Sequence, residues 1–143
     1  MPSYSVDRIK GLPPKKDGSK SMWTKENEIP RLTKLRKKVL AKRGNGNLLV
    51  KNISIVLRVH VGPRSNANVG DLDNFVTGVC DGLQKAHGNT NLPPAWDRPD
   101  RESIHPSKVI AIENDKEVIS IVAEKIFDDK DPKPWYSIKL TGE

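Results

Sequence analysis

Apolar and polar residues alternate with the period of a strand in several separate stretches of this chain. The clearest alternation covers residues 53–61, where every second residue is Ile, Leu or Val, which is typical of a strand with one buried face. Residues 118–126 form a β-branched run that predicts a second strand, and residues 135–140 alternate as a last one. Weaker patterns predict strands at residues 4–9 and 109–112.

Two other stretches have apolar residues at helical spacing. The first helix is expected to begin near Pro30, which suits a first helical turn, and to end at Gly44. The second helix begins after the Asp-rich segment at residues 71–73, and its apolar stripe consists of Leu72, Phe75, Val76, Val79, Cys80 and Leu83. The order strand, helix, strand, helix, strands predicts an α+β (mixed α/β) fold, in which a mixed sheet packs against two main helices.

The remaining segments are expected to be irregular, within a single small domain that spans residues 1–143. Residues 15–25 are polar and basic, and we interpret them as a mobile loop that faces phosphate. Trp23 in this loop is either a stacking partner for an unpaired base or a packed surface residue. Residues 88–108 contain four prolines and show no period, which indicates a long irregular insertion on the surface.

Composition excludes several classes of protein. No apolar run approaches the roughly 20 residues that cross a bilayer, and residues 1–10 lack the apolar middle of a secretory signal. The single cysteine, Cys80, excludes an internal disulfide and a cysteine-rich zinc site. We therefore expect a cytoplasmic protein that does not bind a membrane.

Positive charge is concentrated in the first half of the chain. The net charge is +7, but residues 1–64 contain 16 Lys and Arg against 4 Asp and Glu, whereas residues 65–143 contain 9 against 14. The predicted first helix contributes a run of cations without an intervening acid: Arg31, Lys34, Arg36, Lys37, Lys38, Lys42 and Arg43. This run is either a solvated face or a surface that binds a nucleic-acid backbone.

Asp71 and Asp73 are unexpected in so basic a protein. Two carboxylates one residue apart on a short turn can direct oxygens toward one small volume, and Mg²⁺ binds one or two carboxylates together with water and phosphate. A helix N-cap accounts for one of these aspartates but not for both. We expect Asp115, in a polar turn before the strand at 118–126, to be a third ligand, with Glu113 as its rival. The predicted chemistry is metal-assisted attack of water on a phosphodiester.

Two motifs in the chain resemble the signature of a known family. The segment Gly70-Asp71-Leu72-Asp73-Asn74-Phe75, followed by Asp81-Gly82-Leu83, is similar to the first motif of the RusA family of Holliday-junction resolvases. The later segment Asn114-Asp115-Lys116-Glu117-Val118, with Lys125 ten residues after Asp115, resembles the second motif. The resemblance extends over roughly residues 4–140, and the two motifs in order are far more specific than either alone.

The resemblance implies a homodimeric endonuclease that uses Mg²⁺, with Mn²⁺ as a possible substitute, to cut four-way DNA junctions in recombination and repair. The family's three essential aspartates match Asp71, Asp73 and Asp115, which would be both catalytic residues and metal ligands. Asn74 matches a recurrent asparagine that would support the site by donating a hydrogen bond. The residues expected to hold the phosphates of branched DNA are Arg64, Lys34, Lys37, Lys38 and Lys125.

The chain departs from the family pattern at three places. Thr77 stands where the family usually has a lysine, Asn114 replaces the first of two adjacent aspartates, and the insertion at 88–108 is longer than the family's connection. Lys116 and Lys125 are candidates to replace the missing lysine. Thr77 therefore leaves a second hypothesis open, a catalytically weak or inactive member that binds branched DNA. A third hypothesis is a nuclease that acts on flaps, single strands or RNA.

Overall fold

A four-stranded mixed sheet forms the centre of the protein. The computed structural model describes residues 1–18, 20–88 and 91–143, so that residue 19 of the predicted basic loop and residues 89–90 of the predicted insertion lie outside the described residues. The strands are β1 (Ser3–Lys10), β2 (Ile53–Gly62), β3 (Val118–Phe127) and β4 (Trp135–Thr141), in the order β1-β4-β2-β3. β4 is antiparallel to both of its neighbours, whereas β2 and β3 are parallel.

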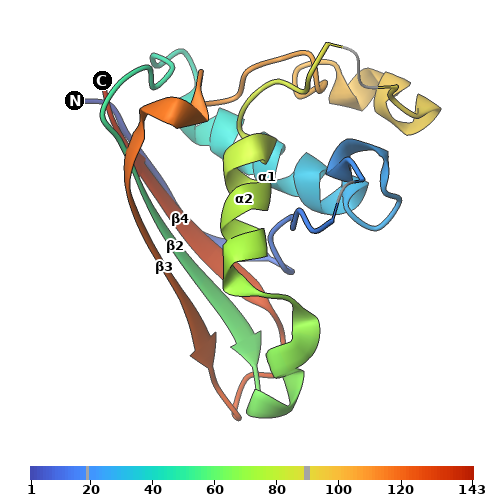
Figure 1. Cartoon of the computed structure of the whole chain (residues 1–143), viewed down its shortest axis with the longest axis vertical. Helices are drawn as coiled ribbons and strands as arrows, with labels where there is room; N and C mark the ends of the chain where they lie inside the picture. Colours follow the sequence, from blue (N-terminus) through green and yellow to red (C-terminus); the bar gives the residue numbers. More distant parts are fainter. Residues whose placement is uncertain (19, 89–90) are drawn as a thin grey trace.

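Two helices, α1 (Ile29–Arg43) and α2 (Leu72–Gly82), lie on one face of this sheet (Figure 1), and the predicted α+β fold is confirmed. The period-two residues of β2 and the apolar stripes of both helices meet in one core, as their spacing predicts. The predicted strand at 109–112 does not form within the described chain, because that segment makes only an isolated bridge between Ile112 and Leu49.

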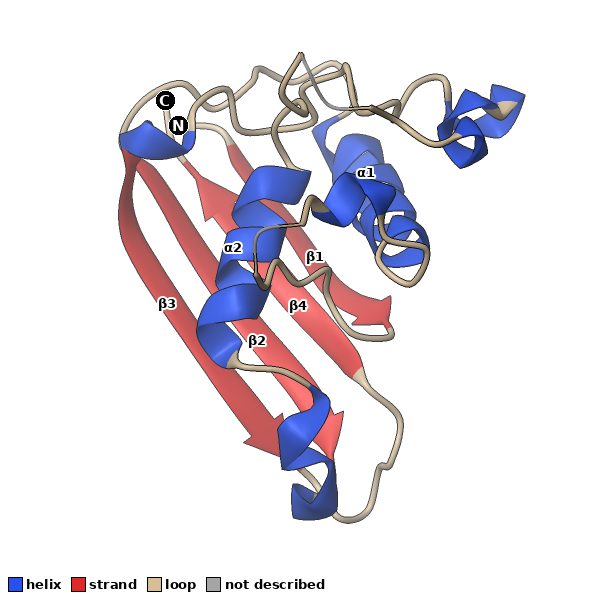
Figure 2. Cartoon of the chain, turned by 45° about the vertical axis from the view of Figure 1, so that its right-hand side comes forward, coloured by secondary structure: helices blue, strands red, loops and turns tan. Residues whose placement is uncertain are grey.

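The direction of α2 decides where the candidate site residues lie. Its first residue follows the 3-10 segment η2 (Arg64–Val69), which leaves the end of β2, and its last turn lies near the start of β3 (Figure 2). At that second end, the carbonyl of Leu83 accepts hydrogen bonds from the main-chain N–H groups of Ile110, Ala111 and Ile112. The helix therefore runs opposite to β2 and β3, and its two ends lie at opposite ends of the sheet.

β3 is an edge strand whose apolar residues are largely exposed. Among the described residues it pairs only with β2. Ile119 is 67% exposed, Val122 55% and Ile121 46%. The predicted strand therefore forms, but its first half is largely exposed.

Arg36 corrects the predicted basic face of α1. Its side chain is fully buried, and the guanidinium donates five hydrogen bonds of 2.7–2.8 Å to main-chain carbonyls. The acceptors belong to Gly82, Gln84, Ile104, His105 and Lys108. Arg43 likewise donates to the carbonyl of Ile110 at 2.7 Å. Arg36 therefore fixes the second half of the predicted insertion against α1, and Arg43 fixes the segment that follows the insertion.

The aromatic residues of the irregular segments are also packed. Trp96 is fully buried, lies 5.8 Å from Trp23 between ring centroids, and donates its indole N–H to the carbonyl of Trp23 at 2.9 Å. Trp23 is itself only 6% exposed, so the structure favours packing over base stacking. His60 alternates with the core-facing residues of β2, so its position predicts a surface residue, but it is buried because its ring stacks on that of Trp135 at 4.7 Å between centroids.

Across the described segments of the chain, no helix has both the length and the apolar character that crossing a membrane requires.

Candidate metal centre at the start of α2

The chain turns into α2 through a tightly packed glycine. A Cβ atom on Gly70 would lie 2.7 Å from the ring of Phe75, so only glycine fits between η2 and the helix. Asp71 then takes the N-cap position, where its main-chain carbonyl accepts from the N–H groups of Asn74 and Phe75. Its carboxylate makes no capping hydrogen bond. The capping role is therefore filled by the main chain, and the carboxylate of Asp71 remains available for a ligand.

Asp71 and Asp73 are both exposed, at the end of α2 where the helix dipole favours negative charge. Within the described residues, neither carboxylate has an ion pair or a hydrogen-bond partner. Two unpaired carboxylates fit the way in which Mg²⁺ is commonly bound, through one or two carboxylates together with waters and substrate phosphates.

The segment at residues 14–16 packs directly on α2. A Cβ atom on Gly78 would lie 2.1 Å from the carbonyl oxygen of Pro14, so glycine permits this close approach. The main-chain N–H of Lys16 donates to the carbonyl of Asn74 at 3.1 Å. Asn74 thus fixes this segment through its main chain, while the predicted supporting role of its side chain stays a prediction.

Cations surround η2, the segment that leads to the two aspartates. The ammonium of Lys125 donates to the carbonyl of Ala67 at 3.1 Å, and that of Lys15 to the carbonyl of Val69 at 3.5 Å. The guanidinium of Arg64 lies 4.5 Å above the ring of Phe127. Arg64 and Lys125 were predicted from the sequence as phosphate contacts, whereas Lys15 was not singled out. Lys15 directly follows Pro13-Pro14, which marks it as the first residue of the predicted basic loop. Nothing in the sequence, however, indicates that it contacts Val69.

Thr77 cannot take over the role that a lysine would have at its position. Its hydroxyl donates to the carbonyl of Asp73 at 3.0 Å, within the helix itself. No lysine or arginine occurs in α2, whose sequence is LDNFVTGVCDG. Any cation at this site must therefore come from another segment.

Asp115 does not join Asp71 and Asp73 within one chain. Its main-chain N–H donates to Oε1 of Gln84 at 3.3 Å, near the far end of α2. The amide of Gln84 folds back and donates to the carbonyl of Cys80, which lies seven residues after Asp73 and so about 10 Å further along the helix axis. No group of three or more His, Cys, Asp or Glu side chains in the described part of the chain is arranged to hold a metal ion. The expectation of three converging carboxylates in a single chain is corrected accordingly.

The turn around Asp115 is nevertheless well defined. The side chain of Asn114 accepts from the main-chain N–H of Lys116 at 3.0 Å and caps the 3-10 segment η5 (Asp115–Glu117). Asparagine serves this capping role as well as aspartate does, which explains how the substitution at residue 114 is accommodated. Asp115 and its rival Glu113 are both exposed.

A cavity of about 240 Å³ lies beside Asp115. Its lining includes Lys16 and Asp81, whose charged groups form an ion pair at 3.3 Å. Cys80 lies close by and is buried, as predicted from its position on the apolar stripe. Burial, together with the charges of Asp81 and Asp115, raises the pKa of the Cys80 thiol to about 12. The thiol is therefore protonated and unreactive at neutral pH.

The predicted phosphate contacts on α1 are exposed, as the helical spacing predicts. The ammonium of Lys34 donates to the carbonyl of Lys10 at 2.9 Å, and that of Lys37 lies 3.5 Å from the carboxylate of Asp100. Lys38 is exposed beside them. Exposed pairs of this kind are weak, so DNA can compete for these cations. Their binding to phosphate stays a prediction.

No protein-family model matches this chain, and a search of curated proteins finds no match.

Proposed function

We propose that this protein is a Mg²⁺-dependent, structure-selective DNA endonuclease that resolves four-way junctions in recombination and repair, as the resemblance to the RusA family implies. The observation that supports it most is the exposed pair Asp71 and Asp73, whose carboxylates make no capping bonds. The pair follows η2, a segment that contains Arg64 and accepts hydrogen bonds from Lys125 and Lys15. Cations around the segment that leads to an acidic pair suit a site that must attract a phosphodiester and hold a metal ion against it.

The proposal includes a homodimer formed along β3. The outer edge of β3 has unpaired main-chain N–H and C=O groups, and Ile119, Ile121 and Val122 expose apolar surface. Both features favour pairing with a strand of another chain. The exposed residues are centred near Ser120–Ile121. A second copy of the chain, related by a two-fold axis at that point, would pair its own β3 antiparallel to this one.

Such a dimer would complete the metal site. A two-fold axis near Ser120–Ile121 exchanges the two ends of β3, so Asp115 of the partner subunit falls opposite residues 125–127. Those residues lie beside η2, since Lys125 bonds to Ala67 and Phe127 packs under Arg64. The third carboxylate that is missing within one chain would thus reach Asp71 and Asp73 from the other chain.

In this proposal, bound Mg²⁺ supplies charge stabilisation and a water of lowered pKa for attack on phosphorus. Asp71 and Asp73 hold the ion and orient that water, while Arg64 and Lys125 hold the phosphates on either side of the cut. The lysines of α1 bind the adjoining arm of the junction through its backbone.

The activity is tested with a labelled four-way DNA junction, incubated with Mg²⁺ and then with EDTA. Paired cuts that require Mg²⁺ are expected from the unaltered protein, and Asp73→Asn should lower the rate roughly 10²–10³-fold while junction binding persists. Asp97→Asn, which alters an exposed aspartate of the insertion, is the matched control. Equal cutting by Asp73→Asn would remove the site assignment. Flap, single-stranded and RNA substrates test the hypothesis of a nuclease with a different target.

The shared site has a test of its own. Asp73→Asn and Asp115→Asn are each expected to cut far more slowly than the unaltered protein, but a mixed dimer of the two retains one intact site and should nick one strand of the junction at a rate close to normal. A mixed dimer of Asp71→Asn and Asp73→Asn is the control, because both of its sites stay damaged. If tagged mixed dimers of the first kind show no nicking, the two chains do not share a site.

A second candidate function, binding of branched DNA without turnover, is favoured by Thr77 and by the separation of Asp115 from the acidic pair. It predicts salt-sensitive junction binding and no cleavage at any Mg²⁺ or Mn²⁺ concentration.

A further inference from the structure

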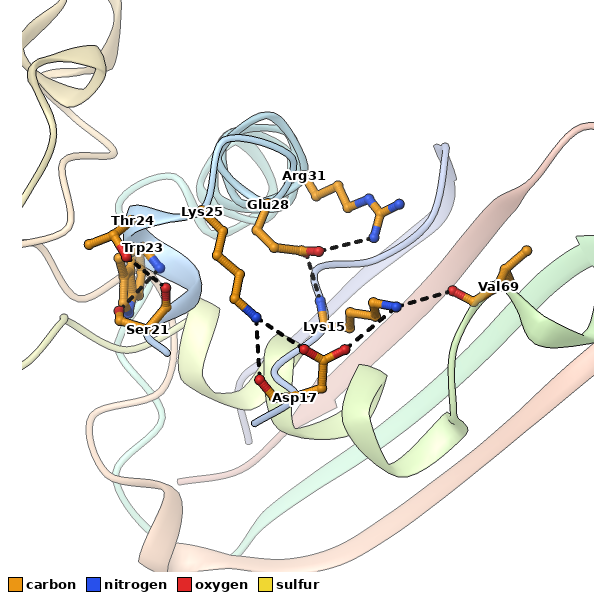
Figure 3. A network of polar contacts seen from close by, with 9 residues as sticks. All are labelled: Lys15, Asp17, Ser21, Trp23, Thr24, Lys25, Glu28, Arg31 and Val69. Atoms are coloured by element: carbon orange, nitrogen blue, oxygen red, sulfur yellow. Dashed lines mark hydrogen bonds and ion pairs between the residues drawn. The ribbon is translucent and has the colours of Figure 1, made fainter. Parts of the chain in front are cut away.

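Lys15 makes contacts at both its main chain and its ammonium group (Figure 3). Its main-chain N–H donates to Oε1 of Glu28 at 3.0 Å, and Glu28 is only 1% exposed. Its ammonium lies 3.6 Å from the carboxylate of Asp17 and donates to the carbonyl of Val69. The main chain of Lys15 is thus fixed, whereas the two contacts of its ammonium are long enough for an incoming anion to replace them.

The stem of Lys15 lies along the main chain that enters α2. A Cβ atom on Gly70 would meet Cδ of Lys15 at 3.2 Å. The ammonium therefore ends beside Val69, two residues before Asp71. The lysine side chain is 25% exposed, so an incoming phosphate can reach it without displacing the core.

Asp17 has a second cationic partner, Lys25, and does not depend on its ion pair with Lys15. Its carboxylate accepts a 3.0 Å hydrogen bond from Lys25, shorter than the 3.6 Å contact with Lys15. The bond to Lys25 lowers the pKa of Asp17, which stays ionised at neutral pH. When the ammonium of Lys15 turns toward an anion, Asp17 keeps a partner, so the movement leaves no uncompensated charge.

We propose that Lys15 is a catalytic residue of this site, whose ammonium contacts a non-bridging oxygen of the scissile phosphate. The inference rests on the proposed nuclease function. A phosphate that approaches two carboxylates needs positive charge in addition to the metal ion, and α2 offers none. The ammonium of Lys15 transfers no proton and acts by stabilising the negative charge that develops on the phosphate oxygens.

The test compares Lys15→Met, Lys15→Arg and the control Lys20→Met, which removes an exposed lysine of the same loop. Cleavage of a four-way junction is measured in single turnover at saturating protein and Mg²⁺, with junction affinity measured in EDTA and Tm measured for each variant. Lys15→Met is expected to slow cleavage roughly 10²-fold with little change in affinity or Tm, since one stabilising contact is lost in the transition state. Lys15→Arg should restore part of the rate, and Lys20→Met should match the unaltered protein.

The outcomes separate the two proposals. If the unaltered protein cuts and Lys15→Met cuts equally fast, the role of Lys15 is overturned and the nuclease function stands. The catalytic role is also overturned if the cleavage rate of Lys15→Met falls only in proportion to its junction affinity, because Lys15 then contacts the DNA backbone equally in the ground state and in the transition state. If the unaltered protein cuts no nucleic acid in the presence of metal, the nuclease function fails and the role of Lys15 fails with it.

Discussion

Replacing Arg36 with methionine should destabilise this protein more than any change at its surface. The guanidinium has five N–H donors, and all five are used by main-chain carbonyls at 2.7–2.8 Å. Burial lowers the pKa of Arg36 to about 9, which is still high enough for the group to be charged at neutral pH. Methionine fills much of the same space but removes a donor from all five carbonyls, of which that of His105 keeps the main-chain N–H of Lys108 at 2.8 Å.

The magnitude follows from two opposed terms. Hydrogen bonds to a charged group are worth about 1.5–3 kcal/mol each, so five bonds give a gross contribution of roughly 8–15 kcal/mol. Bringing a charged group into the interior costs several kcal/mol, and some of the freed carbonyls will bind water, which together leave a net loss of about 3–5 kcal/mol. For 143 residues, an unfolding entropy of about 2.1 cal/mol/K per residue converts this loss into a fall in Tm of roughly 10–17 °C.

Thermal unfolding followed by circular dichroism measures this change. Lys37→Met, at the neighbouring exposed position, should alter stability by less than about 0.5 kcal/mol and serves as the control. Arg36→Lys keeps the charge but has only three donors, so its stability should fall between those of the unaltered protein and Arg36→Met. A loss below about 1 kcal/mol for Arg36→Met would refute the reasoning, since typical single hydrogen bonds contribute that much.

Other predictions follow from single contacts. Gly78→Ala places a methyl group against the carbonyl of Pro14 and should lower the free energy of unfolding by about 1–3 kcal/mol in a urea titration. Gly88→Ala, where no other atom of the described residues lies within 4 Å, should change it by less than about 0.5 kcal/mol. Cys80 should resist a thiol reagent at pH 8 and react only after denaturant is added, because burial raises the pKa of its thiol to about 12; rapid labelling of the folded protein would contradict that environment. Ile121→Asp should convert the proposed dimer into a monomer in sedimentation velocity, and an unchanged mass would argue against pairing along β3.

The sheet and its helices could be predicted because their signals are local. The alternation in β2 and the stripe in α2 each depend on neighbours within a few residues, and both elements form where those patterns predict them. The fate of Arg36 could not be predicted in the same way. Its acceptors are main-chain carbonyls 46–72 residues away, and carbonyls are present at every position whatever the side chain. His60 was misplaced for a similar reason, since Trp135 covers it from another strand.

The candidate site was predicted in part. Asp71 and Asp73 lie where their turn and helix signals indicate, on the surface and without capping bonds. Asp115 was assigned to the same place because the order of the two motifs in the chain does not show in which direction the helix between them runs. A stronger inference was available from the pattern itself: a helix that starts with the acidic pair and connects two parallel strands must run back along the sheet. Its far end, and the start of the strand that follows it, then lie away from the acidic pair.

The parallel pairing of β2 with β3 also has a consequence for how the chain reaches this structure. All of residues 63–117 must be brought into a closed loop before the two strands meet, which costs at least about 3.5 kcal/mol of chain entropy. The antiparallel pairing of β4 with β1 and β2 does not remove that requirement, because β3 precedes β4 in the chain and pairs on the outer side of β2. We expect the amide protons of β3 to exchange with solvent sooner than those of β2, and Asp115 to reach its final position among the last residues to do so.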